Sequence, residues 1–156
     1  MASEKQYLYF KFLYDEEEKR FSTLQDHAKN NLTLVTLYSA FLGFAFDKEK
    51  ISNFVSLTLF TAAMLLMVFA FLTSLWATQI STYEAPSDPE EILAEMGDTP
   101  PSDDEFFDDR IVDFSVAYKR NSNVNDSKAS WLSLARYSLL LGIFVHACYY
   151  LTTAIS

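Results

Sequence analysis

The sequence predicts an all-α integral membrane protein with three transmembrane helices and two amphipathic cytoplasmic helices. Half of the 156 residues are hydrophobic, and most of these gather in three blocks separated by charged stretches. This pattern is typical of spans and loops in a lipid bilayer, and it differs from the spread of apolar residues along a globular domain. The chain divides accordingly into an N-terminal amphipathic helix (1–30), a hairpin of two spans (31–77), an acidic loop with a second amphipathic helix (78–130) and a third span (131–156).

The first thirty residues predict an amphipathic helix. Apolar side chains recur there at three- and four-residue steps or their sums, so they share one stripe of a helix. The stripe comprises Phe10, Tyr14, Phe21, Leu24 and Ala28. It can be buried by another helix or by lipid headgroups, and packing on a helix is favoured. No clean apolar run with a small-residue cleavage site occurs in this segment, so a secretory signal is not expected.

Three uncharged segments are the predicted spans. Residues 32–46 number fifteen, about 22 Å of helix, which is short for a hydrocarbon core of ~30 Å. They suffice if the helix continues without a break from the preceding segment. A tight turn at 47–52 is followed by 53–77, which supplies twenty-five residues without a charge. The third span is 132–155, where Arg136 lies one turn inside and can snorkel to the interface.

The segment between the second and third spans is strongly acidic. From Glu84 to Asp109 it has eleven Asp or Glu, no Lys or Arg, and all four prolines of the chain. A solvated mobile loop is predicted for its first half, with room for a short helix at 89–96, and the spacing of its acids does not match a calcium-binding loop. The second half predicts an amphipathic helix with apolar steps of four, three and four residues. These apolar residues are Phe107, Ile111, Phe114 and Tyr118.

The loops also predict the orientation. Five Lys or Arg precede the first span and four lie in the second loop, against two in the first loop and none after the third span. The positive-inside rule therefore places the N-terminus in the cytoplasm and the C-terminus outside the inner membrane. Trp76 ends the second span and Trp131 begins the third, and both are expected to anchor at the inner interface together with Arg136.

Neither a catalytic, a cofactor-binding nor a metal site is expected. The chain has three glycines, which leaves no phosphate-binding loop, and its two histidines fall on opposite predicted sides of the membrane. No pair of polar residues in the spans is placed to act as acid and base, so an enzyme is not expected. A net charge of −9 argues against nucleic acid as a partner. The hydroxyls of the spans serve helix packing or line a water-filled path in an oligomer.

Two short segments carry a resemblance to a known family. Asp26 and Lys29 form an acid-x-x-Lys step that runs into the first span, and Tyr118-Lys119 lies on the helix that leads into the last one. In this order of elements nearly the whole chain resembles the transmembrane effectors of bacterial anti-phage systems, in particular the Pycsar-type effector membrane domain. The family reads Asp-x-Lys-Ala where this chain reads Asp26-His27-Ala28-Lys29, and a separate nucleotide-sensing domain is not expected in these residues.

The resemblance implies a homo-oligomer that perturbs or permeabilises the inner membrane and arrests the infected cell. Activation would then come from a defence-system sensor protein or from a ligand of the cytoplasmic helices. Three spans are too few to enclose a pore in one protomer, and each amphipathic stripe needs a partner, so self-association is expected. The alternative is a non-conducting scaffold or accessory subunit that anchors a soluble partner through the acidic loop.

Overall fold

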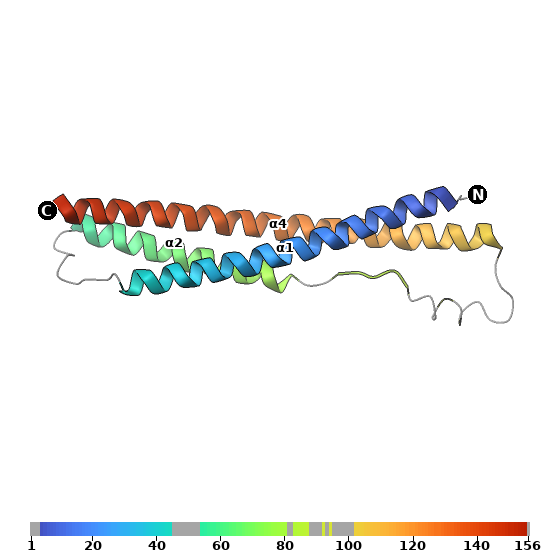
Figure 1. Ribbon diagram of the computed structural model, residues 1–156, viewed down its shortest axis with the longest axis horizontal. Helices are drawn as coiled ribbons and strands as arrows, with labels where there is room; N and C mark the ends of the chain where they lie inside the picture. Colours follow the sequence, from blue (N-terminus) through green and yellow to red (C-terminus); the bar gives the residue numbers. More distant parts are fainter. Residues whose placement is uncertain are drawn as a thin grey trace. The chain divides into compact units, whose positions relative to one another are not determined.

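All regular secondary structure is helical in the part of the chain that the computed structural model describes, which is residues 4–44, 54–80, 83–87, 92, 94 and 102–155. Three long helices follow one another, namely α1 (Glu4–Phe44), α2 (Phe54–Gln79) and α4 (Asp103–Ile155) (Figure 1). The predicted all-α class is confirmed. The turn predicted at 47–52 lies outside the described residues. Of the short helix predicted at 89–96, only Ile92 and Ala94 are described, and both are helical.

Helices α1 and α4 each join an amphipathic segment to an apolar block without a break. They contain 41 and 53 residues. No proline falls in either helix, which removes the commonest cause of a break. The Asn-rich stretch 121–127 is poor in helix propensity, yet it stays helical because Asn121 and Asn125 are buried and hydrogen-bonded by their side chains.

A seven-residue repeat orders the buried face of every long helix. In α1 one series of buried or half-buried side chains recurs every seven residues and a second series follows it three residues later. The two series are Tyr7, Tyr14, Phe21, Ala28, Val35 and Leu42, then Phe10, Glu17, Leu24, Asn31 and Tyr38. The corresponding series are Ser56, Ala63, Ala70 and Ala77 in α2, and Phe107, Phe114, Asn121, Lys128, Ala135, Gly142 and Tyr149 in α4. Such a repeat is the pattern of coiled-coil packing.

The chain forms two compact units. Unit 1 is Met1–Thr23 with Ser81–Ser127, and unit 2 is Leu24–Ile80 with Lys128–Ser156. In unit 1 the first half of α1 runs parallel to the start of α4, and its core is Tyr14, Phe114 and Ala117 with Tyr7, Phe10 and Tyr83 packed against it.

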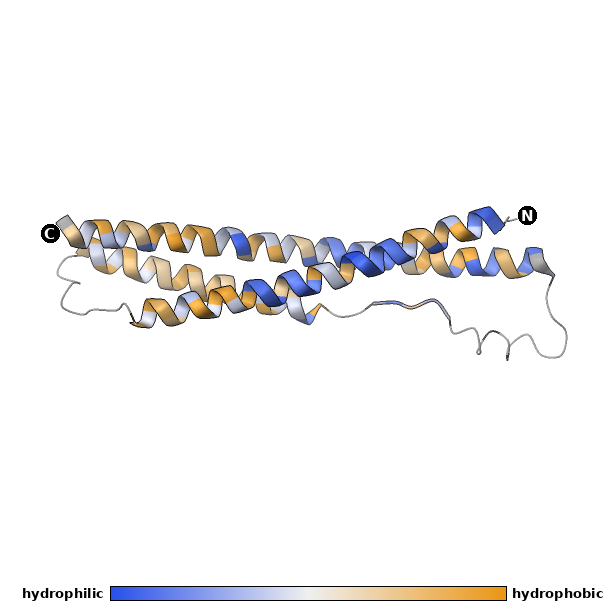
Figure 2. Ribbon diagram, in the orientation of Figure 1, coloured by the Kyte–Doolittle hydropathy of each residue, from blue (hydrophilic) through white to orange (hydrophobic). Residues whose placement is uncertain are grey.

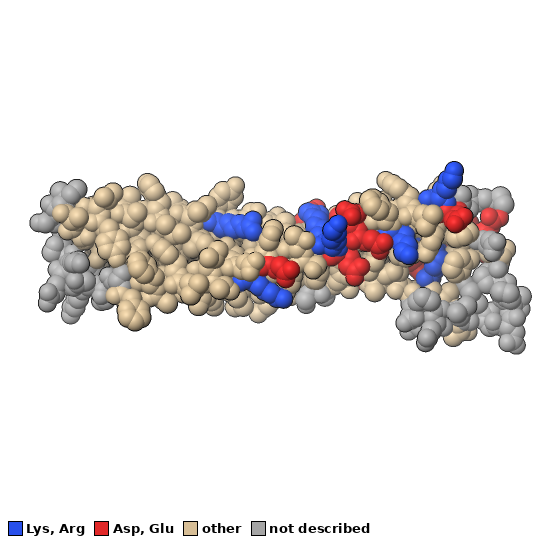
Figure 3. All heavy atoms as spheres, viewed as in Figure 1, with Lys and Arg blue, Asp and Glu red and all other residues tan. Residues whose placement is uncertain are grey.

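Unit 2 is a bundle of three helices in which α2 runs antiparallel to the other two (Figure 1). One core cluster contains Val35, Leu42, Met67, Ala70 and Leu139, and a second contains Ala28, Ala77 and Leu132. Hydrophobic residues dominate its helices in Figure 2, and the face seen in Figure 3 carries few charged side chains. Charged residues are frequent on the visible face of unit 1.

Two of the described helices, α2 and α4, are long and apolar enough to cross a membrane. Only 22% and 33% of their most apolar windows are buried within the chain, so most of this apolar surface faces outward. The remaining predicted span, residues 32–46 at the end of α1, does not meet the same test among the described residues. The structure describes residues 32–44 of that span, about 20 Å of helix, which is shorter than the ~30 Å hydrocarbon core. By length and composition the structure therefore supports two spans and not three.

Candidate functional site

The aromatic residues predicted from the two amphipathic helices meet in unit 1. The rings of Tyr14 and Phe114 are 5.5 Å apart between centroids, and both residues are buried. Phe10 packs against this pair, while the Phe107 ring lies 5.7 Å from that of Tyr7. Such tilted and edge-on pairs at 4.5–7 Å are favourable. The two helices thus bury part of each other's predicted stripe.

Three predicted packing residues are not part of the core of unit 1. Ile111 and Tyr118 are only half-buried, and the buried positions beside them are occupied by Arg110 and Ala117. Leu24 packs in unit 2, against the cluster that contains Ala28. The prediction followed the large apolar side chains at steps of three and four residues, and it therefore missed that the buried face of α4 also passes through Arg110 and Ala117. The signal was present in the seven-residue spacing from Phe107 to Lys128.

The segment 83–87 is held against α4 by Asn121. The side-chain amide of Asn121 donates to the carbonyl of Glu84 at 2.8 Å, and its oxygen accepts from the Glu84 backbone N–H at 2.9 Å. Arg120 adds an ion pair with the Glu84 carboxylate. Phe21 contacts this segment as well, with its ring 5.0 Å from that of Tyr83. Burial raises the pKa of the Tyr83 hydroxyl, and the nearby Tyr14 and Glu18 raise it further.

A second polar layer of unit 1 joins α1 to α4. The Asn125 amide donates to the Glu17 carbonyl at 2.9 Å and to its carboxylate at 2.6 Å. Arg20 pairs with Asp126 at 2.6 Å. Buried polar residues at core positions of a seven-residue repeat fix which helices pair and in which register. Unit 1 is therefore specified by polar contacts as much as by its aromatic core.

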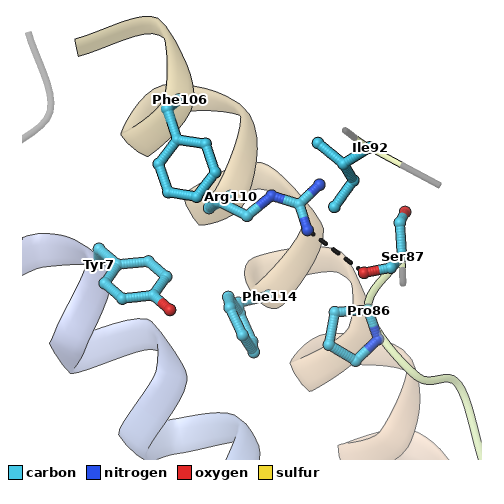
Figure 4. Close-up of a pocket in the computed structure, with 7 residues that line it drawn as sticks. All are labelled: Tyr7, Pro86, Ser87, Ile92, Phe106, Arg110 and Phe114. Atoms are coloured by element: carbon cyan, nitrogen blue, oxygen red, sulfur yellow. Dashed lines mark hydrogen bonds between the residues drawn. The ribbon is translucent and has the colours of Figure 1, made fainter. Parts of the chain in front are cut away.

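Unit 1 also contains a largely apolar pocket of about 350 Å³ (Figure 4). In Figure 4 Tyr7 extends from α1 toward α4, which carries Phe106 and Phe114. The remaining lining residues are Pro86, Ser87, Ile92 and Arg110.

Arg110 is the one charged residue among those that line this pocket, and only 9% of it is exposed. One terminal nitrogen, Nη2, pairs with the Asp113 carboxylate at 2.6 Å, and Nη1 donates to the Ser87 carbonyl at 3.3 Å. The third nitrogen, Nε, is buried without a hydrogen-bond partner among the described residues. A buried donor left unpaired costs about 1–3 kcal/mol, so an acceptor brought to Nε would be favoured.

Polar pairs also occur within the bundle of unit 2. The Asn31 amide donates to the Ser74 hydroxyl at 2.8 Å, and the Tyr38 hydroxyl lies 2.8 Å from His146 Nδ1. Each pair joins α1 to a different helix, and all four residues are buried or half-buried. These are the interhelical hydrogen bonds expected between packed helices in an apolar surrounding.

Lys128 is a fully buried cation of unit 2. Its ammonium group donates to the side-chain oxygen of Gln25 and to the Ile80 carbonyl, the latter at 2.8 Å. Burial lowers the pKa of Lys128, and the neighbouring charge of Lys29 lowers it further. Ile80 directly follows the last residue of α2, so Lys128, which lies on α4, stabilises the C-terminal end of α2.

The predicted interface anchors are only partly grouped. Trp76 and Trp131 contact each other, with ring centroids 6.3 Å apart in an edge-on arrangement, and both rings are exposed. Arg136 is exposed on α4. Across the described residues, no three His, Cys, Asp or Glu side chains are grouped to hold a metal ion.

No protein-family model, curated protein or solved structure matches this chain. The resemblance to anti-phage membrane effectors therefore stays a prediction.

Proposed function

We propose that this chain is a membrane-embedded effector that self-associates and permeabilises the inner membrane in bacterial anti-phage defence. Exposed apolar side chains in unit 1 carry the self-association part of the proposal. On α1, Leu8 and Phe12 are 52% and 57% exposed, and on α4 Val112 and Val116 are 59% and 43% exposed. Each pair is four residues apart and so forms a stripe on its helix. In water such stripes favour a partner surface, and a second copy offers the same stripes.

In this proposal unit 2 crosses the membrane with three spans. The N-terminus of the chain then lies inside the cell and the C-terminus outside. Large apolar side chains point outward from α2 and α4, among them Leu65, Leu72, Leu140, Phe144 and Leu151, all more than half exposed. Lipid is the solvent that suits this surface. The apolar part of α1 would cross as the shortest span, which requires local thinning of the bilayer.

Permeation would occur between protomers rather than through one bundle. The core of unit 2 is filled by Val35, Leu42 and Met67, none of which is more than 1% exposed. Helix α2 also approaches α4 closely at Gly142, where an added Cβ would lie 3.3 Å from Leu66 Cβ. A single bundle thus has no room for a water path at this level. Triggering would come from a sensor protein or a ligand that changes how unit 1 associates.

The alternative of a non-conducting scaffold has one observation in its favour. Exposed hydroxyls of the apolar helices bond to their own backbone: Thr33 to the Lys29 carbonyl at 3.1 Å and Thr36 to the Leu32 carbonyl at 2.8 Å. Hydroxyls satisfied in this way are tolerated in lipid without water. They would then contribute nothing to a pore, and the chain would serve as an anchor for a soluble partner.

Membrane potential, read with a voltage-sensitive dye in bacteria, tests the proposal. Cells expressing the full chain should depolarise and stop growing, whereas cells expressing a version without residues 132–156 should do neither. A double variant, Phe12→Glu with Val112→Glu, should prevent depolarisation because it charges both exposed stripes of unit 1. The matched control, Ser22→Glu with Ser127→Glu, adds the same charge at exposed polar positions and should depolarise as the parent does.

Loss of depolarisation in the Phe12/Val112 double variant, with the control intact and cross-linked oligomers lost in parallel, would support an oligomeric effector. Unchanged potential with the full chain at good expression, together with a monomer on native gels, would favour the scaffold. Depolarisation equal in both double variants would contradict a role for the exposed stripes.

A further inference from the structure

We propose that the pocket of unit 1 is a binding site for a small uncharged molecule built of an aromatic ring and one carbonyl-type oxygen. The site is formed by Tyr7, Phe106 and Phe114 as apolar walls and by Arg110 as a hydrogen-bond donor. The inference concerns binding alone, so it stands or falls independently of membrane permeabilisation.

The size and lining of the pocket suit one substituted ring. Its volume of about 350 Å³ falls at the lower end of the ~300–1,000 Å³ range of ligand sites. An apolar cavity of only ~150 Å³ is enough to hold benzene in a protein interior. Three aromatic side chains border the space, and the Tyr7 and Phe114 rings already meet edge-on at 5.7 Å. A ring entering between Phe106 and Phe114 would extend this edge-to-face packing.

The polar part of the ligand is defined by the one nitrogen of Arg110 that has no partner among the described residues. Nη1 donates to the Ser87 carbonyl and Nη2 pairs with the Asp113 carboxylate. These two contacts hold the guanidinium in place. Nε remains buried and can donate one hydrogen bond. In Figure 4 the guanidinium lies on the side of the pocket where Ser87 and Ile92 are found. A ligand therefore needs a single acceptor at one edge of an otherwise apolar body.

Charge excludes an anion as the preferred ligand. The Arg110 guanidinium is already paired with the Asp113 carboxylate at 2.6 Å. Four acidic residues precede Arg110 within two turns of the same helix, and their charges repel an anionic ligand. These residues are Asp104, Glu105, Asp108 and Asp109. A simple cation such as an ammonium ion offers no acceptor for the Arg110 Nε–H, the donor that defines the site. An uncharged acceptor meets the free N–H without either penalty.

Acetophenone is a suitable probe, because it combines a phenyl ring with one carbonyl oxygen. The measurement is the 1H–15N correlation of the arginine Nε–H groups in the detergent-solubilised full chain. The chain has four arginines, and each signal can be assigned by an Arg→Lys variant. Titration with acetophenone should shift the Arg110 signal to saturation, while Arg20, Arg120 and Arg136 report any nonspecific effect of probe dissolved in the micelle.

Two analogues test the chemistry of the ligand. Ethylbenzene lacks the acceptor and benzoate carries a charge, so both should bind at least tenfold more weakly than acetophenone. An equal response to acetophenone and ethylbenzene would overturn the hydrogen bond to Nε. A stronger response to benzoate would overturn the assignment of an uncharged ligand.

A pair of tryptophan variants tests the location. Ile92→Trp fills the pocket from one of its walls, and it should abolish the shift of the Arg110 signal. Val112→Trp adds the same bulk on the exposed face of α4 and should leave the titration unchanged. The helical circular dichroism of both variants shows whether the fold is kept. A normal acetophenone titration in Ile92→Trp, or no response of Arg110 in the parent chain up to the solubility of the probe, would overturn the proposal.

Discussion

The Tyr38 hydroxyl on α1 lies 2.8 Å from Nδ1 of His146 on α4. His146 is 2% exposed, and its other ring nitrogen, Nε2, has no partner among the described residues. Tyr137, also on α4, is by contrast 73% exposed. Removing the Tyr38 hydroxyl would therefore leave a buried histidine without its hydrogen bond, whereas removing the Tyr137 hydroxyl would not affect the core.

We therefore expect Tyr38→Phe to lower the free energy of unfolding by about 1–3 kcal/mol, the cost of leaving a buried polar group unpaired. Tyr137→Phe removes the same hydroxyl from an exposed tyrosine of unit 2 and should change it by less than about 0.5 kcal/mol. Thermal unfolding of both variants in one detergent, followed by circular dichroism, compares them. Equal midpoints for the two variants would contradict a stabilising Tyr38–His146 bond.

Residue patterns predicted the aromatic part of unit 1 better than its polar part. Tyr14 and Phe114 could be found because apolar side chains at helical spacing have few alternatives to burial. The seven-residue spacing could place Arg110, Asn121 and Lys128 near the buried face, but it could not identify the distant partners that a buried polar side chain requires. Their partners, Ser87, Glu84 and Ile80, lie 23, 37 and 48 residues away in sequence. Local spacing contains no information about such contacts.

At the scale of the elements, the close approach of α2 and α4 depends on a glycine. An added Cβ at Gly142 would lie 2.3 Å from Met67 Cε, 3.3 Å from Leu66 Cβ and 3.7 Å from the Ala63 carbonyl oxygen. Met67 is 1% exposed and has little space into which it can move. At Gly43, near the end of α1, the same added Cβ would meet no atom of another described element within 4 Å.

The two glycines provide a matched test of this packing. Gly142→Leu should destabilise the bundle by about 1–3 kcal/mol, because the larger side chain overpacks the contact between α2 and α4. Gly43→Leu makes the same change where there is space, and the better helix propensity of leucine should leave stability equal or slightly higher. Chemical denaturation in mixed micelles gives both values. A Gly142→Leu variant as stable as the parent would show that the helices do not approach as described.

The sequence predicted that α1 and α4 continue without a break, but it predicted only part of the face that each helix buries. Uninterrupted helices follow from the lack of proline in both segments. The first span was predicted to reach residue 46, and the structure describes its helix as far as Phe44, so residues 45–46 lie outside the described part. The seven-residue repeat appears only when polar residues such as Glu17 and Asn31 are accepted as core positions.

For the whole molecule, the number of spans decides on which side each terminus lies. If α1, α2 and α4 all cross the bilayer, Ser22 and Ala154 lie on opposite sides. If only α2 and α4 cross, the two positions lie on the same side. Both side chains are exposed in the structure, so a label can reach them once they leave the membrane.

We expect three spans and hence opposite accessibility. In a Cys148→Ser background, which removes the only native cysteine, Ala154→Cys should react with a membrane-impermeant maleimide in intact spheroplasts. Ser22→Cys should react only after the membrane is opened. Reaction of both cysteines, or of neither, before the membrane is opened would show that α1 does not cross.

The polar pairs of unit 2 constrain how this sequence can vary over evolution. Asn31 with Ser74 and Tyr38 with His146 each place one partner on α1 and the other on a different helix. A change at one position leaves the buried polar group at the other without its hydrogen-bond partner. Single substitutions should therefore be selected against, whereas paired substitutions that restore the contact should survive. Across descendants of this chain, positions 31 and 74, and positions 38 and 146, are expected to change together.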